Sequence, residues 1–237
     1  MPTKLLIIIP CYNEEVTIAG LLNELLAIEF TPDFQVSVAV VNDCSKDNTK
    51  KIVQQFKAVV LLDLAMNLGI GGAMQTGYRY AYENKFDLAI QMDGDGQHPP
   101  AEINKLLQHW HSIKSNIVIG SRFISKQGYQ SSILRRGGIN YLKWINRCFT
   151  GNMIHDCTSG FRLFDSKAIA TAVRYYPDEY PEPESLVCFS KAGLTISEVA
   201  VHMKKRQGGQ SSIRYSSQLY YIVKVTIAMF YSFIRKQ

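Results

Sequence analysis

The chain has 237 residues, of which 46% are hydrophobic and 19% are charged, and its formal net charge is +6. This composition excludes disordered, collagen-like and disulfide-scaffold proteins, and the length suits a single α/β domain. The five cysteines are scattered without a CxxC pair, so neither a disulfide framework nor a zinc ribbon is expected. The positive charge is compatible with anionic partners but selects none of them.

Short apolar runs alternate with segments of helical period in the first half of the chain. Strands are predicted at 4–9, 36–42, 58–63, 87–93 and 116–120, and helices at 13–28, 47–57, 70–83 and 100–112. Near-continuous Val, Ile and Leu strands separated by helices are typical of a mostly parallel sheet with helices on both faces. Ligands of such sheets bind beyond the carboxyl ends of the strands, so the residues that follow each strand are the candidates for function.

The second half is less regular. Helices are predicted at 132–149, 166–174 and 184–192, a strand at 194–201 and a mobile glycine-bearing loop at 203–214. The segment 216–235 has the pattern of a helix with a broad apolar face and flanking cations, which suits either a membrane interface or a contact with the core or a second copy. No signal peptide and no uncharged apolar run of about 18 residues is found, so we expect a cytosolic protein.

The clearest chemical motif is the sequence DGDGQHPP at 93–100, directly after a predicted strand. Asp93 and Asp95 are joined by one glycine, so both carboxylates can turn toward one point. Mg²⁺ and Mn²⁺ prefer such oxygen ligands together with the phosphates of a substrate. The alternative is a plain turn in which Asp and Gly are simply favourable residues.

Polar segments also follow the first two predicted strands, PCYNEE at 10–15 and NDCSKDNT at 42–49. Asn13 is a candidate cap of the first helix, and Ser45 or Asp47 of the second. Asp43 precedes the capping position, and a nucleotide base or ribose contact would explain it. The glycines of NLGIGGA at 67–73 are compatible with a phosphate cradle or with close packing of a helix start.

Seven segments in order resemble family 2 glycosyltransferases, most closely the polyprenyl-phosphate sugar transferases of the dolichol-phosphate-mannose-synthase-like branch. They are PCYNEE, NDCSKDNT, NLGIGGA, DGDGQHPP, GSRF at 120–123, DCTSGFRLF at 156–164 and RQGGQSS at 206–212, and the resemblance covers about residues 4–214. It implies the glycosyltransferase A-type (GT-A) fold in residues 1–214, a nucleotide-sugar donor, a divalent cation (Mg²⁺ or Mn²⁺) and inversion at the anomeric carbon. Residues 215–237 are then a separate C-terminal amphipathic helix.

The resemblance also implies roles for single residues. Asp93 and Asp95 would hold the metal and the donor diphosphate. Residues that would hold the nucleotide are Pro10, Tyr12, Glu14, Asp43 and Asp93. Residues that would contact the diphosphate or an anionic acceptor are Gln97, Arg122, Arg162, Arg206, Ser211 and Ser212, the last three on a closing loop. Arg135 and Arg136 are further cations for a lipid phosphate.

The acceptor decides whether a general base is needed. An ionised lipid phosphate needs positioning cations, whereas a sugar hydroxyl needs a base within hydrogen-bond reach. Candidate bases are Glu184, Glu182 and Asp156, with Glu184 placed slightly ahead of Glu182. Both glutamates could instead complement the dipole at a helix N-terminus.

We therefore predict an inverting, metal-dependent transferase that moves a sugar from a UDP- or GDP-sugar to a polyprenyl phosphate or lipid-linked glycan, in cell-surface polysaccharide or glycoconjugate synthesis. The second motif reads Asn42-Asp43-Cys44-Ser45 where the family commonly has Asp-Asp-Gly-Ser, so the donor stays open. We expect attachment at the cytosolic membrane face or to a membrane-protein partner, homo-oligomer formation as an option and no nucleic-acid partner. The alternatives are a non-catalytic nucleotide-sugar-binding subunit and, less favoured, a sugar-phosphate nucleotidyltransferase.

Overall fold

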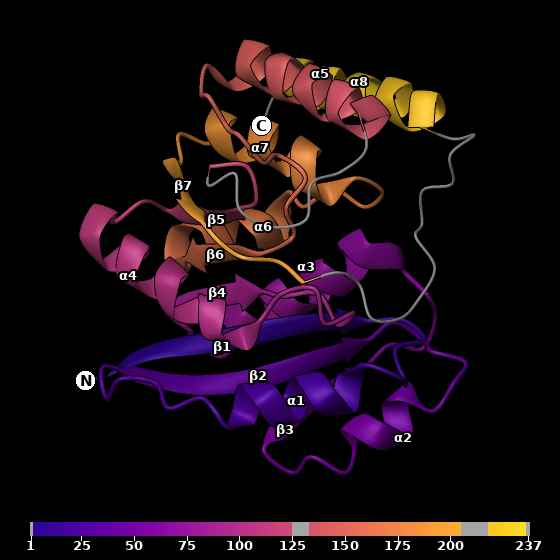
Figure 1. The fold of residues 1–237 in the computed structure, drawn as a ribbon, viewed down its shortest axis with the longest axis vertical. Helices are drawn as coiled ribbons and strands as arrows, with labels where there is room; N and C mark the ends of the chain where they lie inside the picture. Colours follow the sequence, from indigo (N-terminus) through magenta and orange to yellow (C-terminus); the bar gives the residue numbers. More distant parts are fainter. Residues whose placement is uncertain (1, 125–132, 205–217, 236–237) are drawn as a thin grey trace.

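The computed structural model describes residues 2–124, 133–204 and 218–235, with the side chains of 133–136 and 218–219 outside that description. Its sheet is built from seven strands in the order β3-β2-β1-β4-β6-β5-β7. The strands are β1 (Thr3–Cys11), β2 (Phe34–Asn42), β3 (Val59–Asp63), β4 (Leu88–Gln91), β5 (Ile117–Ser121), β6 (Arg162–Asp165) and β7 (Ile196–Ala200). The sheet is parallel except that β6 runs antiparallel between β4 and β5, which confirms the predicted mostly parallel α/β fold (Figure 1).

The helices cover both faces of this sheet. They are α1 (Ile18–Leu26), α2 (Thr49–Val53), α3 (Gly69–Glu83), α4 (Ile103–Ile113) with the preceding 3-10 turn η1 (Pro100–Glu102), α5 (Ile133–Thr150), α6 (Ser166–Arg174), α7 (Pro181–Lys191) and α8 (Gln218–Ile234). Strand β1 serves both faces. Its residues Leu5, Ile7 and Ile9 pack with α1, α2 and α4, and its residues Leu6 and Ile8 pack with α3, α6 and α7. Burial on both faces explains the unbroken apolar run of this strand.

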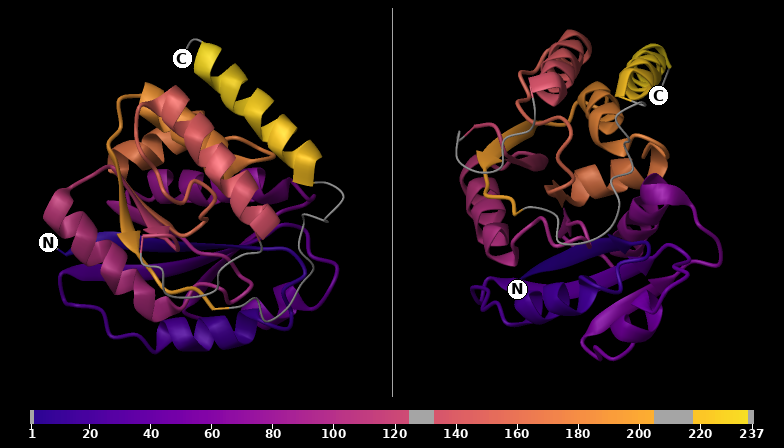
Figure 2. Two further views of the ribbon diagram at one scale, coloured as in Figure 1. Left: turned by 45° about the horizontal axis from the view of Figure 1, so that its top comes forward. Right: turned by 45° about the vertical axis from the view of Figure 1, so that its right-hand side comes forward.

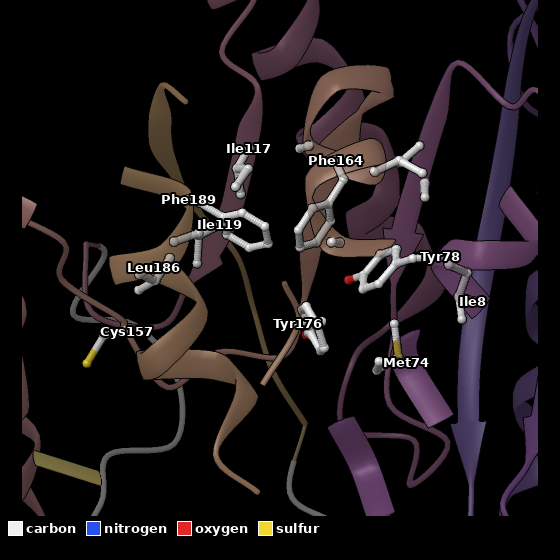
Figure 3. Close-up of a cluster of buried hydrophobic side chains, with 14 of the residues drawn as sticks. Ile8, Met74, Tyr78, Ile117, Ile119, Cys157, Phe164, Tyr176, Leu186 and Phe189 are labelled. Carbon is white, nitrogen blue, oxygen red and sulfur yellow. The ribbon is translucent and has the colours of Figure 1, made fainter. Parts of the chain in front are cut away.

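The core on the α3 side contains a row of aromatic rings (Figure 3). The ring of Tyr78 lies 4.8 Å from that of Phe164 and 5.1 Å from that of Tyr176, and Phe164 lies 5.6 Å from Phe189. These residues come from α3, β6, the segment after α6, and α7. Tilted and edge-to-face aromatic pairs add to the stabilisation from area burial. The row therefore ties the two halves of the chain together beneath the ends of the central strands.

Helices α5 and α8 lie side by side on the side of the molecule away from β1–β3 (Figures 1 and 2). Val225 and Met229 of α8 are fully buried. The hydroxyl of Ser232 donates to Glu184 Oε1 at 2.6 Å. The ammonium of Lys191 donates to the backbone carbonyls of Ser232, Phe233 and Arg235, so a cation satisfies the last turn of α8.

Three details differ from the sequence prediction. Helix α1 begins at Ile18 rather than 13, because Asn13 has a φ of 57° and its side chain accepts from the backbone N–H of Lys46 instead of capping a helix. Helix α2 has only five residues; Asn48 makes no side-chain capping bond, but Oδ1 of the predicted cap candidate Asp47 accepts the backbone N–H of Thr49 at 2.9 Å. Strand β6 was not predicted, because four residues inside a polar motif are too short to show a period. The predicted loop at 203–214 lies outside the described residues from 205 onward.

Candidate active site

The carboxylates of Asp93 and Asp95 follow the end of β4, in the middle of the sheet. Asp95 is 3% exposed and its Oδ1 accepts the backbone N–H of Gln97 at 3.0 Å, whereas the side chain of Asp93 is 36% exposed. The turn is packed closely against β1. A Cβ added at Gly94 would lie 2.8 Å from Cys11 Sγ and 3.1 Å from the Pro10 carbonyl. Only glycine therefore allows this approach, which argues against a plain surface turn.

His98 supports this turn from below. Its Nδ1 accepts the backbone N–H of Asp93 at 3.1 Å, which assigns the ring proton to Nε2, and its ring stacks on Phe161 at 5.0 Å. Burial lowers the pKa of His98 to about 4, against an opposing attraction to Asp95. The imidazole is therefore uncharged at physiological pH and supports the turn through its hydrogen bond to Asp93.

Two further residues lie against Asp93. A Cβ added at Gly160 would lie 3.0 and 3.2 Å from the carboxylate oxygens of Asp93 and 3.3 Å from Nε2 of Gln91. Gln91 is fully buried, and its Oε1 accepts from the hydroxyls of Tyr78 and Tyr176 at 3.1 and 3.0 Å. Its Nε2 is the single buried side-chain nitrogen or oxygen without a hydrogen bond in the described part of the chain. The sheet thus places a polar layer directly behind Asp93.

The ends of β1 and β2 bring the expected nucleotide-contact residues to the same edge. Tyr12 is 44% exposed. The backbone N–H of Asp43 donates to the Cys11 carbonyl at 2.9 Å, and the backbone N–H of Glu14 donates to Thr49 Oγ1 at 2.8 Å. These segments are adjacent because β1 and β2 pair in parallel, so both strands end at the same edge of the sheet. Pro10, Tyr12, Glu14 and Asp43 therefore lie at one edge of the sheet, and their role toward a nucleotide stays a prediction.

Asp43 has a structural explanation that the sequence interpretation lacked. Its two carboxylate oxygens accept the backbone N–H groups of Leu68 and Gly69, at 2.7 and 3.0 Å. Asp43 therefore caps the N-terminus of α3, a helix that begins 26 residues further along the chain. Burial raises the pKa of Asp43, and these two bonds oppose the rise. Gly71 and Gly72 accordingly allow close packing, whereas Gly69 has open space around it and a φ of 75°. A Cβ at Gly71 would lie 2.2 Å from the Pro177 carbonyl oxygen.

Arg122 and Asp156 form a bidentate ion pair beside the Asp93 turn. Arg122 Nε and Nη2 donate to the two carboxylate oxygens of Asp156, both at 2.7 Å, and the backbone N–H of Arg122 donates to Oδ2 at 3.0 Å. The side chain of Asp156 is fully buried. Burial opposes the charge on Arg122, but the bonds to Asp156 and the field of Asp93 prevail and raise its pKa. A buried carboxylate held in this way is unsuited to act as a general base, which corrects the interpretation of Asp156.

Arg162 does not face a phosphate site, contrary to the prediction. It is fully buried and donates to the carbonyls of Ser159, Cys157 and Glu182 and to the hydroxyl of Ser185. These bonds join the 157–159 loop to the start of α7. Arg162 stabilises the architecture behind the site, because its guanidinium satisfies backbone oxygens that burial would otherwise leave unpaired.

The two candidate glutamates differ in the groups that act on them. Glu184 accepts from Ser232 of α8, so it belongs to the contact between α7 and α8. Burial raises the pKa of Glu182, Arg162 opposes the rise, and the charges of Asp93 and Arg122 also act on it. The charges that act on Glu184 are instead those of Asp178 and Glu179. Glu182 is therefore the glutamate whose pKa responds to the charges of Asp93 and Arg122.

Sequence reasoning missed Glu198 and His155. Glu198 lies on the edge strand β7, and its carboxylate accepts the backbone N–H groups of both His155 and Asp156. No motif marked Glu198, because the partner segment lies some 40 residues away and meets β7 only in the folded sheet. Arg206, Ser211 and Ser212 lie outside the described residues, as do the side chains of Arg135 and Arg136.

A divalent cation fits the residues at the Asp93 turn. Cations of this type are commonly held by one or two carboxylates and by substrate phosphates, rather than by a cage of protein ligands. The described residues contain no group of three or more His, Cys, Asp or Glu side chains that could hold a metal. Asp93 and Asp95 with the diphosphate of a donor would complete such a site.

Comparison with known proteins agrees with this arrangement. Residues 6–171 match the family described as Glycosyl transferase family 2. A UDP-N-acetylglucosamine--dolichyl-phosphate N-acetylglucosaminyltransferase of Methanococcus voltae is 30% identical over 221 residues, covering 85% of this chain and 86% of that protein. A dolichyl-phosphate beta-glucosyltransferase of Homo sapiens is 28% identical, covering 88% of this chain and 70% of that protein.

The fold is shared with solved glycosyltransferases. Glucosyl-3-phosphoglycerate synthase from Mycobacterium tuberculosis, solved with Mn²⁺, UDP-glucose and phosphoglyceric acid, aligns with a TM-score of 0.73 at 14% identity, covering 99% of this chain and 81% of that one. Mannosyl-3-phosphoglycerate synthase from Rubrobacter xylanophilus aligns with a TM-score of 0.73 at 16% identity, covering 97% and 74%. Family match and fold agree, and the chain is a GT-A glycosyltransferase that belongs to glycosyl transferase family 2.

Proposed function

We propose that this enzyme moves a sugar from a nucleoside-diphosphate donor to a polyprenyl phosphate, with inversion at the anomeric carbon. Asp93 and Asp95 would hold the donor diphosphate together with a divalent cation, which would supply positive charge opposite the leaving group. A phosphate oxygen of the acceptor forms the new bond to the anomeric carbon. The bond from that carbon to the diphosphate oxygen breaks, and the nucleoside diphosphate leaves with the electron pair.

The observation that carries this choice of acceptor is the pairing of Arg122 with Asp156. Beside the Asp93 turn the structure offers a guanidinium that both oxygens of a buried carboxylate hold in place. A lipid phosphate is ionised at neutral pH and needs such a cation for positioning. A sugar hydroxyl would need a base, and Glu182 is the remaining candidate for that role. The names of the dolichyl-phosphate relatives support the same acceptor class.

The acceptor is tested by assaying transfer from UDP- and GDP-sugars onto a short-chain polyprenyl phosphate and onto a soluble glycoside. Glu182→Gln is the decisive variant, because it preserves volume and removes the ability to take a proton. We expect transfer onto the phosphate and retention of most activity in Glu182→Gln. Transfer only onto the glycoside, lost in Glu182→Gln, would contradict the proposal and assign Glu182 as the base.

Donor and metal binding are tested by thermal unfolding with UDP or GDP, with and without Mn²⁺. A ligand at about 100 times its Kd adds about 2.7 kcal/mol, which corresponds to a rise in Tm of about 5–10 °C for a chain of this size. We expect Asp95→Ala to lose this rise. Asp87→Ala is the matched control, because Asp87 accepts a backbone N–H just before β4, at the opposite end of that strand.

The surface of α5 and α8 supports attachment to a membrane. Large side chains on the outer side of α8 are about half exposed or more: Tyr220, Val223, Ile227, Phe230, Tyr231 and Ile234. Trp144 of the adjacent α5 is 60% exposed. Aromatic and aliphatic side chains with nearby cations such as Lys143 and Arg147 suit the boundary between lipid headgroups and acyl chains. No helix in the described ranges is long and apolar enough to span a bilayer.

We propose that this face lies on the cytosolic membrane surface and brings the acceptor to the site. The wild-type protein should co-sediment with vesicles of phosphatidylcholine and phosphatidylglycerol. Ile227→Asp should abolish this binding, whereas Ile113→Asp, which changes an equally exposed residue of α4, should preserve it. Loss of a dimer in Ile227→Asp without loss of vesicle binding would instead assign the face to contact between two copies.

A further inference from the structure

Glu198 is a buried carboxylate to which the proposed mechanism gives no role. It lies in the middle of β7, at the edge of the sheet, and its side chain is 7% exposed. A buried charge is costly unless hydrogen bonds compensate it. Its carboxylate instead hydrogen-bonds one short segment, residues 155–156, which contacts the site.

Three donors converge on this carboxylate. Oε2 accepts the backbone N–H of His155 at 2.6 Å and lies 2.9 Å from His155 Nδ1. Oε1 accepts the backbone N–H of Asp156 at 2.8 Å. Bonds from N–H groups to a carboxylate are charge-assisted and about twice as strong as neutral ones. Two successive peptide groups are therefore held by both oxygens of one side chain.

The Asp156 side chain continues the chain of bonds. Its oxygens accept from Nε, Nη2 and the backbone N–H of Arg122 and from the hydroxyl of Thr158. Arg122 Nη2 also donates to Thr158 at 2.8 Å. The orientation of the guanidinium thus depends on where the backbone of Asp156 lies. Glu198 accepts the backbone N–H of Asp156 and so restrains that position.

We propose that Glu198 is a positioning residue for the transfer reaction. It holds the His155–Asp156 peptide so that Asp156 directs the Arg122 guanidinium toward the anion bound at the Asp93 turn, and it does not itself touch the substrate. Arg122 lies close enough to Asp93 for that carboxylate to raise its pKa. The inference rests on the proposed role of Arg122 toward the acceptor phosphate.

The test compares Glu198→Gln with Ser197→Ala on the same strand. The amide keeps the size of Glu198 but has one acceptor oxygen for three donors. Ser197, its neighbour on β7, bonds His109 and Ser115 away from the site, so its loss is a control for general weakening of β7. We expect Glu198→Gln to raise the KM for polyprenyl phosphate on the order of tenfold, since catalytic rates depend on sub-ångström placement. The Kd for the nucleotide and Mn²⁺ should be unchanged.

Two further measurements separate this inference from the proposed function. In an Arg122→Gln background, Glu198→Gln should add no further rise in KM, because both act through one group. The NMR signal of the Arg122 Nε–H, protected by Asp156 in the wild type, should exchange faster in Glu198→Gln, and this readout needs no activity. A lower Tm with KM and Nε–H exchange both unchanged would overturn the positioning role. Faster exchange with no transfer onto any polyprenyl phosphate would support it and refute the proposed acceptor.

Discussion

Gly160→Ala tests whether the Asp93 carboxylate is held in a functional position by the absence of a side chain behind it. The added Cβ would lie 3.0 and 3.2 Å from the two oxygens of Asp93 and 3.3 Å from Gln91 Nε2. The new methyl group, the Asp93 carboxylate or the Gln91 amide must therefore shift by a few tenths of an ångström. Gln91 is fixed by two tyrosine hydroxyls, whereas Asp93 is partly exposed, so we expect Asp93 to move.

The cost to the fold should be small and the cost to activity large. Displacement of a partly exposed side chain from its rotamer costs about 0.5–1.5 kcal/mol. Misplacement of a reacting or metal-holding group by about 1 Å can reduce the rate on the order of a hundredfold. We therefore expect Gly160→Ala to lower kcat/KM by about 10- to 100-fold and to weaken stabilisation by nucleotide with Mn²⁺. The free energy of unfolding should change by only about 1 kcal/mol.

The assay is sugar transfer together with denaturant unfolding and thermal shift with Mn²⁺. Gly20→Ala is the matched control, because Gly20 lies within α1 and an added Cβ there meets no atom within 4 Å. Alanine should stabilise that helix by about 1 kcal/mol and leave transfer unchanged. Wild-type Mn²⁺ dependence and activity in Gly160→Ala would refute the reasoning.

Three further predictions concern stability. Arg162→Met should destabilise the fold by at least about 3 kcal/mol in urea titrations, because several buried oxygens lose their donor at a cost of about 1–3 kcal/mol each. Wild-type stability with lost nucleotide affinity would instead return Arg162 to the phosphate site. Gly71→Ala should destabilise the fold by about 1–3 kcal/mol, because its Cβ would overlap the backbone of Pro177 and Asp178. The check is a lower Tm in Gly71→Ala than in Gly20→Ala. Because of His98, the metal-free protein should lose stability as pH falls from about 6.5 to 4. The pKa of His98 is about 4 in the folded state and higher in the unfolded chain, so the unfolded chain binds the proton first. Protonation of the unfolded chain should lower the free energy of unfolding by up to about 3 kcal/mol. Denaturant unfolding in EDTA at pH 7 and pH 4.5 measures this loss of stability, and the loss should be smaller in His98→Gln. An equal loss in His98→Gln would contradict the assignment to His98.

The class of fold, and the sheet edge at which the candidate site residues gather, could be predicted from local sequence. Apolar runs of strand length separated by helical segments require a covered parallel sheet, because only that arrangement buries β1 on both faces. The Asp93–Asp95 turn directly follows a buried strand, and parallel strands release their carboxyl ends at one edge. These features depend on residues near one another in the chain, so their pattern is visible without the fold.

The tertiary structure alone decided what several charged side chains do. Asp43 caps a helix that begins 26 residues later, Arg162 is buried among carbonyls, and Glu184 accepts from Ser232 of α8. Glu198 reaches Asp156 across 42 positions. A motif records which residue types occur together, but a charged group takes its role from the partner that satisfies it. Here that partner comes from a distant segment, and only the folded sheet brings the two together.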